Sequence, residues 1–114
     1  MIAPARPDFI ELPVDDIDAA RSFYTGAFGW DLTAFGPSYA CTMTGDVDIG
    51  LQADPAERSA APLPTIQVDD LDAAVMAVER AGGTVTRPVF AFPGGRRFHF
   101  RDPAGNELAA HKPD

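Results

Sequence analysis

The sequence has one cysteine, Cys41, and few cationic side chains. A single thiol excludes an internal disulfide and suits a reducing compartment, so we expect a cytoplasmic protein. Nine Lys and Arg residues stand against 17 Asp and Glu residues, and the net charge of −8 opposes binding to nucleic acid phosphates. This acidity favours neutral or cationic small molecules, although it is more often a means of keeping a protein in solution.

The sequence also lacks a long apolar run. Its longest uncharged stretch, residues 32–45, is interrupted by Gly, Pro and hydroxyl side chains, whereas a membrane helix needs about 20 mostly apolar residues. The opening residues, MIAPARPD, have no apolar segment of the kind found in a targeting signal. We therefore expect a soluble protein with no membrane partner.

One segment occurs twice. VDDIDAA at residues 14–20 returns as VDDLDAA at residues 68–74. Residues 14–29 align without a gap on residues 68–83, and eight of these 16 pairs are identical. A repeat of this length indicates two copies of one supersecondary unit.

Each copy has the same order of predicted elements. An alternating apolar run, residues 8–14 or 63–68, predicts a strand. An Asp-Asp pair follows and predicts a helix start, because carboxylates cap free backbone N–H groups. Glycine ends each helix, at Gly29 and at Gly82-Gly83. Three strand-like segments then follow, at residues 30–35, 39–43 and 47–52 in the first copy and 84–89, 96–101 and 107–111 in the second.

These patterns predict an α+β fold built from two βαβββ modules. We expect one domain over residues 1–114, with modules at residues 7–52 and 63–112 joined by the polar linker 53–62. Each module would form a curved mixed sheet with a helix on its outer side and an open inner face. Two such faces would enclose a shared cleft, which is a common place for a ligand.

Longer stretches of the sequence carry a family resemblance. DFIELPVDDIDAARSFYTGAFGW, followed by AGG and RRFHFRDPAGNEL, resembles the vicinal oxygen chelate superfamily of glyoxalases, bleomycin-resistance proteins and extradiol dioxygenases. The match covers nearly the whole chain, and its most diagnostic parts are FGW after the first helix and the DPAGN turn. The resemblance implies paired βαβββ modules, frequent homodimers and often a divalent metal. It does not define the chemistry, because the superfamily includes several classes of enzyme as well as metal-free binding proteins.

The resemblance also implies where metal ligands would lie. In metal-dependent relatives they come from the first and last strands of each module, and the matching positions here carry no donor side chain. A divalent ion needs several nitrogen, oxygen or sulfur ligands. We therefore predict no metal and no other cofactor. The vacant positions are Phe9, Gly50, Leu63 and Ala109.

Strand alternation predicts which side chains share a face with these positions, because residues two apart point the same way. The resemblance adds Arg97 and His99, since relatives contact substrate from the strand before the DP turn. The predicted ligand-binding residues are Phe9, Glu11, Tyr39, Gln52, Leu63, Thr65, Gln67, Arg97 and His99.

Glu11 and His99 are candidate catalytic residues. A carboxylate between Ile10 and Leu12 would have a raised pKa and act as a general base, with His99 as a second proton carrier. The alternatives are that Glu11 pairs with Arg97 or contacts the rim, and that His99 is a hydrogen-bonded strand histidine. We expect His111 to be solvated. The segment 90–95, with two aromatics beside two glycines, would be a cleft lid, a hydrophobic plug or a dimer contact.

Two classes of function follow. The first is a metal-free protein that binds or sequesters a small aromatic or cationic molecule, as bleomycin-resistance relatives do. The second is a metal-free isomerase or lyase that uses Glu11 and His99 as acid and base. A metal-dependent glyoxalase or dioxygenase ranks third, so enzyme activity stays open. We expect a small-molecule ligand and a homodimer as partners.

Overall fold

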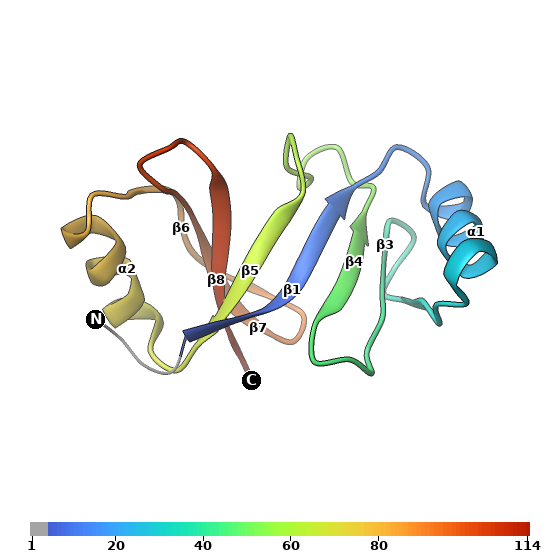
Figure 1. Cartoon of the computed structure of the whole chain (residues 1–114), viewed down its shortest axis with the longest axis horizontal. Coiled ribbons are helices and arrows are strands. Elements are labelled where there is room, and N and C mark those ends of the chain that lie inside the picture. The colour runs from blue at the N-terminus through green and yellow to red at the C-terminus, as the bar shows by residue number, and fades with distance from the viewer. Residues whose placement is uncertain (1–4) are drawn as a thin grey trace. The chain divides into compact units, whose positions relative to one another are not determined.

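A computed structural model describes residues 5–114 and contains eight strands and two helices within them (Figure 1). In chain order these are β1 (Ala5–Pro13), α1 (Ile17–Phe28), β2 (Thr33–Ala34), β3 (Tyr39–Cys41), β4 (Asp48–Gln52), β5 (Leu63–Val68), α2 (Leu71–Arg80), β6 (Thr84–Phe92), β7 (Gly95–Arg101) and β8 (Glu107–Pro113). The order confirms the predicted α+β fold of two βαβββ modules. Neither helix within residues 5–114 is long and apolar enough to cross a membrane.

The chain divides into two compact units. The first unit is Phe9–Leu63, and the second unit is residues 5–8 with Pro64–Asp114. The strand order is β2-β3-β4-β1 in the first unit and β5-β8-β7-β6 in the second. In each unit one pair is parallel, β1 with β4 and β5 with β8, and the other pairs are antiparallel. The predicted cleft shared by the two modules stays a prediction.

Helix α1 begins and ends where the sequence predicts. The side chain of Asp16 accepts hydrogen bonds from the backbone N–H groups of Asp18 and Ala19, each at 3.0 Å. Gly29 ends the helix with a φ of 70°, a left-handed conformation that glycine adopts at little cost. The helix therefore has both of the caps that a short helix needs.

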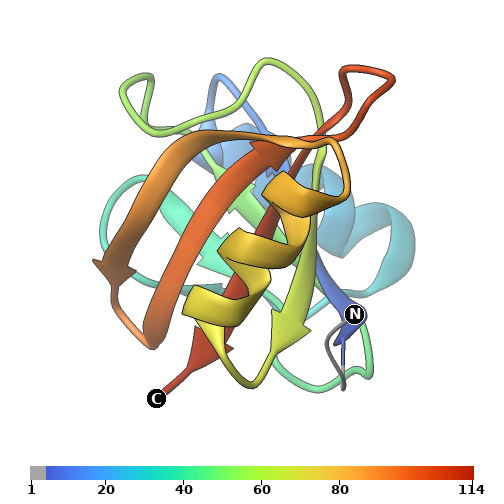
Figure 2. The same cartoon turned by 90° about the vertical axis from the view of Figure 1, so that its left-hand side faces the viewer.

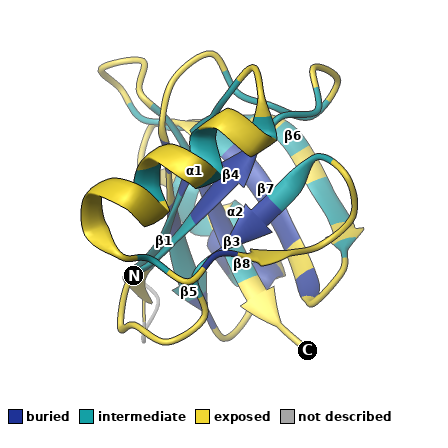
Figure 3. Ribbon diagram, turned by 90° about the vertical axis from the view of Figure 1, so that its right-hand side faces the viewer, coloured by how far each residue is buried: buried dark blue, intermediate teal, exposed yellow. Residues whose placement is uncertain are grey.

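The apolar side of α1 is only partly covered. None of its residues is buried, and Phe28 has 64% of its surface exposed. Tyr24 lies parallel to Trp30 with 5.0 Å between ring centroids, which covers one side of each ring. Figure 3 shows α1 mostly exposed while part of β4 is buried. The core of the first unit is small and centres on Leu32, Ala40 and Leu51.

The predicted linker 53–62 is tied to the end of β1. Arg58 donates hydrogen bonds to the Val14 carbonyl oxygen at 2.8 Å and to the Asp15 carboxylate at 2.7 Å. The Asp15 side chain is 96% exposed, so the ion pair contributes little to stability and serves mainly to position the segment.

Helix α2 packs more closely on its sheet than α1 does. It lies across the strands of the second unit in Figure 2. Asp70 caps it by accepting a hydrogen bond from the Ala73 N–H at 3.0 Å. Leu71 and Ala74 are buried against the strands and join the core cluster. The other buried members of that cluster are Val68, Phe98 and Ala110.

The hairpin of β6 and β7 is longer than predicted. Strand β6 continues to Phe92 and β7 begins at Gly95, so only Pro93 and Gly94 separate the two strands. Phe90 and Phe92 therefore lie in paired strand rather than in a loop, and whether residues 90–95 form a lid, a plug or a dimer contact stays open. Two register shifts interrupt the pairing, one between Val85 and Arg87 and one between Arg87 and Phe90.

The DPAGN turn joins β7 to β8 through one carboxylate. The Asp102 side chain accepts hydrogen bonds from the backbone N–H groups of Ala104 and Asn106 at 2.9 Å and from the Asn106 side-chain amide at 3.0 Å. These bonds, chiefly those from Asn106, hold the pKa of Asp102 below its ordinary value. The turn thus fixes the start of β8.

Candidate functional site

In each unit, buried polar side chains alternate with core residues along the strands and so lie on one face of the sheet. Within residues 5–114 the buried polar or charged residues are Glu11, Gln52, Thr65, Arg97 and His99. All of them are among the predicted ligand-binding residues. They alternate along their strands with core residues such as Leu51 and Phe98, which pack on the helix side. They therefore lie on the sheet face that points away from the helix of their own unit.

In the first unit, aromatic groups fill the space above Gly50. Gly50 pairs with Glu11 on one side and Cys41 on the other. A Cβ atom built on Gly50 would lie 2.6 Å from the Phe9 ring and would also collide with the Tyr39 hydroxyl. Phe9 and Tyr39 thus occupy the volume that a larger residue at this position would need.

Glu11 lies beside this aromatic pair. It is 2% exposed, and the Tyr39 hydroxyl donates a hydrogen bond to its Oε2 atom at 3.3 Å. A buried carboxylate needs such donors, because losing water without replacement bonds is costly. Cys41, on the neighbouring strand, is also buried, and burial followed by the nearby Asp48 raises the pKa of its thiol. That makes Cys41 an inert core residue.

The four positions that the family resemblance predicts for metal ligands carry side chains that do not suit a metal ion. Phe9 and Gly50 offer no donor atom in the first unit. Leu63 and Ala109 are apolar and fully buried. No cluster of three or more His, Cys, Asp or Glu side chains that could hold an ion occurs in residues 5–114. The side chains at these positions therefore could not coordinate a divalent ion. That the protein contains no metal stays a prediction.

The second unit carries a set of polar side chains that we call the polar face. Strand pairing places them in two rows across β5, β8, β7 and β6. The first row is Thr65, Ala109, His99 and Arg87, and the second is Gln67, His111, Arg97 and Phe90. Paired residues point the same way, so both rows lie on the side of the sheet away from α2.

His99 is the most enclosed ionisable group of the polar face. Its side chain is 6% exposed, and its Nδ1 atom lies 3.5 Å from the Glu107 carboxylate. The Thr86 hydroxyl donates to the same carboxylate oxygen at 3.3 Å. Burial first, and then the Arg97 guanidinium, lower the pKa of His99, against an opposing effect of Glu107. The imidazole is therefore neutral at pH 7.

Two guanidinium groups lie over the aromatic side chains of the hairpin. The Arg87 Cζ atom is 3.6 Å from the centre of the Phe90 ring. The Arg97 Cζ atom is 5.3 Å from the Phe90 ring and 5.5 Å from the Phe92 ring. These are cation–π distances, so the aromatic rings and the cations form one packed group.

Two residues of this face differ from the sequence predictions. His111 was expected to be solvated, but its side chain is 14% exposed and its Nε2 atom lies 2.8 Å from the Asp8 carboxylate. Glu107, which holds His99, was not selected as a site residue. Its two-residue spacing from Ala109 places it on the same face, and this was the signal available in the sequence.

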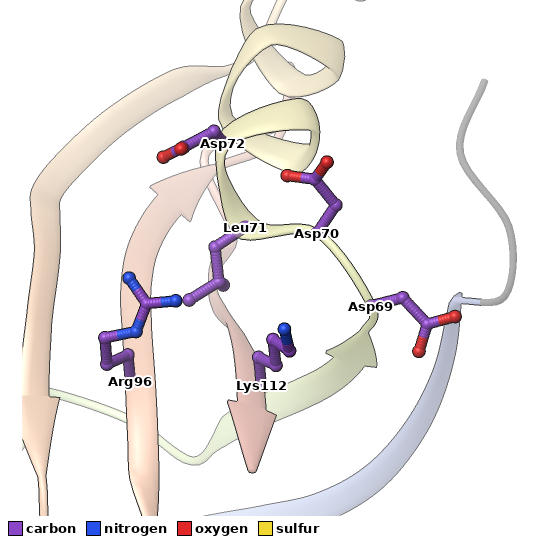
Figure 4. Close-up of a pocket in the computed structure, with 6 residues that line it drawn as sticks. All are labelled: Asp69, Asp70, Leu71, Asp72, Arg96 and Lys112. Atoms are coloured by element: carbon purple, nitrogen blue, oxygen red, sulfur yellow. The ribbon is translucent and has the colours of Figure 1, made fainter. Parts of the chain in front are cut away.

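A separate pocket of about 180 Å³ opens at the start of α2. Figure 4 shows Arg96 and Lys112 on one side of it and the acidic start of the helix on the other. Arg96 precedes Arg97 in the strand, so the two side chains point to opposite faces of the sheet. The residues that line the pocket are Asp69, Asp70, Leu71, Asp72, Arg96 and Lys112. Their charges nearly cancel, which favours no particular ion.

Comparison with known proteins agrees with this fold. Residues 6–110 match the model of the Glyoxalase/Bleomycin resistance protein/Dioxygenase superfamily. The chain therefore belongs to this superfamily, as its sequence resemblance indicated.

Its relatives differ in length. The chain is 34% identical to the anthracycline biosynthesis protein DnrV of Streptomyces peucetius, a match that covers 94% of this chain and 46% of DnrV. It is 33% identical to CFP32 of Mycobacterium tuberculosis, over 87% of this chain and 42% of that protein. The chain thus spans less than half of the curated relatives it matches.

A solved structure has the same fold. Methylmalonyl-CoA epimerase from Mycobacterium tuberculosis superposes with a TM-score of 0.78 at 18% identity, covering 100% of this chain and 93% of the epimerase. At this level of identity the likeness concerns the fold alone.

Proposed function

We propose that this protein binds a small organic molecule without a metal ion, and that the ligand lies against the polar face of the second unit. One observation carries the proposal. A buried, neutral His99 lies in one row with Thr65 and Ala109. Ala109 has no donor atom, although the family resemblance predicts a metal-binding side chain at its position. Such a face provides hydrogen bonds and shape in place of coordination.

The surroundings favour an aromatic ligand over a cationic one. Phe90 and Phe92 offer apolar surface beside the polar rows, whereas Arg87 and Arg97 would repel a cation at close range. The name of the relative DnrV connects it with the biosynthesis of anthracyclines. Thr65 and Gln67 of the second unit belong to this proposal, and the contacts predicted for the first unit, Phe9, Glu11, Tyr39, Gln52 and Leu63, stay predictions.

A metal-free isomerase or lyase is the second candidate. The observation in its favour is a neutral imidazole at His99, since such a ring can accept a proton from an acidic carbon or hydroxyl group. Glu11 is the proposed second acid–base residue, and its burial is compatible with that role. Binding alone requires fewer assumptions, so it stands first.

The test combines metal analysis with ligand titration. We expect purified protein to contain far less than one equivalent of zinc, nickel, iron or manganese. A screen of small aromatic compounds by calorimetry should find binders whose dissociation constants do not change with EDTA. Stoichiometric metal whose removal abolishes binding would contradict the proposal. Turnover of a binder that is lost in Glu11→Gln and His99→Gln, with affinity kept, would favour the second candidate.

A homodimer is a further part of the proposal. Phe23 and Phe28 of α1 are 61% and 64% exposed, which is unusual for aromatic side chains of an isolated monomer. Sedimentation velocity would measure the state of assembly. A monomer at all concentrations would contradict it. The cytoplasmic location stays a prediction.

A further inference from the structure

The hydrogen bond between His99 and Glu107 fixes where the imidazole carries its proton. A carboxylate only accepts hydrogen bonds, so the Nδ1 atom facing Glu107 at 3.5 Å must be the protonated nitrogen. The carboxylate oxygen already accepts from Thr86, which keeps it in place. Because the ring is neutral, its other nitrogen, Nε2, then carries a lone pair.

This Nε2 atom has no protein partner. It is buried, and no hydrogen-bond partner for it occurs within residues 5–114. A buried acceptor left without a donor is costly, and most such atoms in folded proteins are satisfied. Since the Nε2 lone pair can only accept, what completes it must be a hydrogen-bond donor.

The neighbours of His99 limit what can carry that donor. The Phe90 ring lies beside the imidazole with 5.6 Å between ring centroids. Arg87 and Arg97 lie over Phe90 and disfavour an ammonium donor. A carboxylate ligand would place its lone pairs against that of Nε2. A neutral hydroxyl group on an aromatic ring satisfies all of these constraints.

We propose that the ligand is a hydroxylated aromatic molecule whose phenolic or enolic hydroxyl donates a hydrogen bond to His99 Nε2, with Glu107 as the positioning residue that fixes the imidazole tautomer. This inference rests on the proposed function and specifies its ligand class. His99 selects the hydroxyl group, and the hairpin aromatics contact the ring that bears it.

Matched probes test the selection. We would titrate the protein with 2-naphthol and with 2-methoxynaphthalene, which has the same ring but no donor. 2-Naphthol should bind about tenfold more tightly, the effect of one hydrogen bond to an otherwise unsatisfied acceptor. In His99→Phe the two affinities should come within about twofold of each other, because the acceptor is gone.

The tautomer is tested without a ligand. Nitrogen NMR of the free protein should show His99 protonated at Nδ1 and unprotonated at Nε2. Glu107→Gln can donate to Nδ1 as well as accept from it, so the Nδ1-protonated fraction and the preference for 2-naphthol should both fall. Glu79→Gln, an exposed charge neutralisation on α2, is the matched control and should change neither.

The outcomes distinguish the proposed function, metal-free binding, from the further inference that a ligand hydroxyl donates to His99. Equal binding of the probes, or a preference that survives in His99→Phe, overturns the inference but leaves metal-free binding intact. An Nε2-protonated tautomer also overturns it. If neither probe binds while aromatic compounds without a hydroxyl do, only the ligand class is wrong. If no aromatic compound binds, both claims fail. If Glu107→Gln changed neither the Nδ1-protonated fraction nor the preference for 2-naphthol, Glu107 would not be the positioning residue.

Discussion

The two units keep the same helix starts and differ on the sheet face that points away from the helix. In the first unit, Phe9 and Tyr39 fill the space above Gly50 and leave Glu11 as the buried charge. In the second unit, His99 and Arg97 are buried side by side with carboxylates and aromatic rings. The repeated residues are those that start and end a helix, whereas the sheet face away from the helix differs between the two units. Duplication thus preserved the local folding signals and left the chemistry of each face free to change.

The helices show a second difference. Leu71 and Ala74 of α2 are buried, while the corresponding residues of α1, Ile17 and Ala20, are only partly so. Buried apolar area is the main source of stability, so the second unit should contribute more of the protein's stability than the first. Substitutions in the two cores, at Gly50 and at His99 would test this contrast between the units.

The largest effect should come from the core of the second unit. Phe98 is fully buried, and Phe98→Ala should lower the free energy of unfolding by about 3–5 kcal/mol, because it removes apolar contacts and leaves a cavity. Leu51→Ala, at the equally buried core of the first unit, should cost about 2–5 kcal/mol. Urea denaturation would measure both. A larger loss in Leu51→Ala would reverse our order of the two units.

An intermediate effect should come from filling the space above Gly50. Gly50→Ala should destabilise the protein by about 1–3 kcal/mol, because the new methyl group would collide with the Phe9 ring. Gly26→Ala is the matched control: no atom lies within 4 Å of its Cβ position, and a helical alanine should add up to about 1 kcal/mol. Thermal unfolding of both variants would measure this. Tolerance of Gly50→Ala would mean that the aromatic pair moves aside easily.

The smallest effect should be the contribution of His99 to the pH dependence of stability. Burial and Arg97 lower its pKa in the folded protein, with Arg87 acting the same way and Glu107 opposing them. As the pH falls below the ordinary value of 6.5, the unfolded chain binds a proton that the folded protein does not, so stability is lost. The slope from one group is at most about 1.4 kcal/mol per pH unit.

Urea unfolding of the wild type and of His99→Gln at pH 7.5, 6.5 and 5.5 would isolate this contribution. The difference between the two proteins should change with pH in this window. Parallel curves would show that the pKa of His99 is the same in the folded and unfolded states, which would contradict the lowered pKa of the folded protein.

Sequence alone predicted the parts of this structure that depend on neighbouring residues. The carboxylates at Asp16 and Asp70 cap their helices as expected, and strand alternation predicted the shared orientation of residues such as Glu11 and Gln52, which are buried in the structure. Both patterns depend on residues within a few positions of one another, where the geometry of helix and strand leaves little choice.

The errors concern features set by distant residues. The burial of His111 depends on Asp8, 103 residues away in sequence, and no local pattern indicates that pair. The exposure of α1 shows a similar limit, because helical spacing predicts which side chains share a face but not how much of that face is covered. The spacing of Glu107 from Ala109 indicated its face, but its contact with His99 depends on the strand register between β7 and β8.

The register shifts of β6 have a consequence for how this hairpin can evolve. Two residues of β6 lie between Arg87 and Phe90, but only one residue of β7 lies between their partners His99 and Arg97. One residue of β6 is therefore unpaired, as in a β-bulge. Pro88 is exposed at that point and, as a proline, donates no hydrogen bond. Removing it would restore simple alternation and still leave Arg87 opposite His99 and Phe90 opposite Arg97. The hairpin can therefore gain or lose a residue there and bend differently, while the residues of the polar face keep their cross-strand partners.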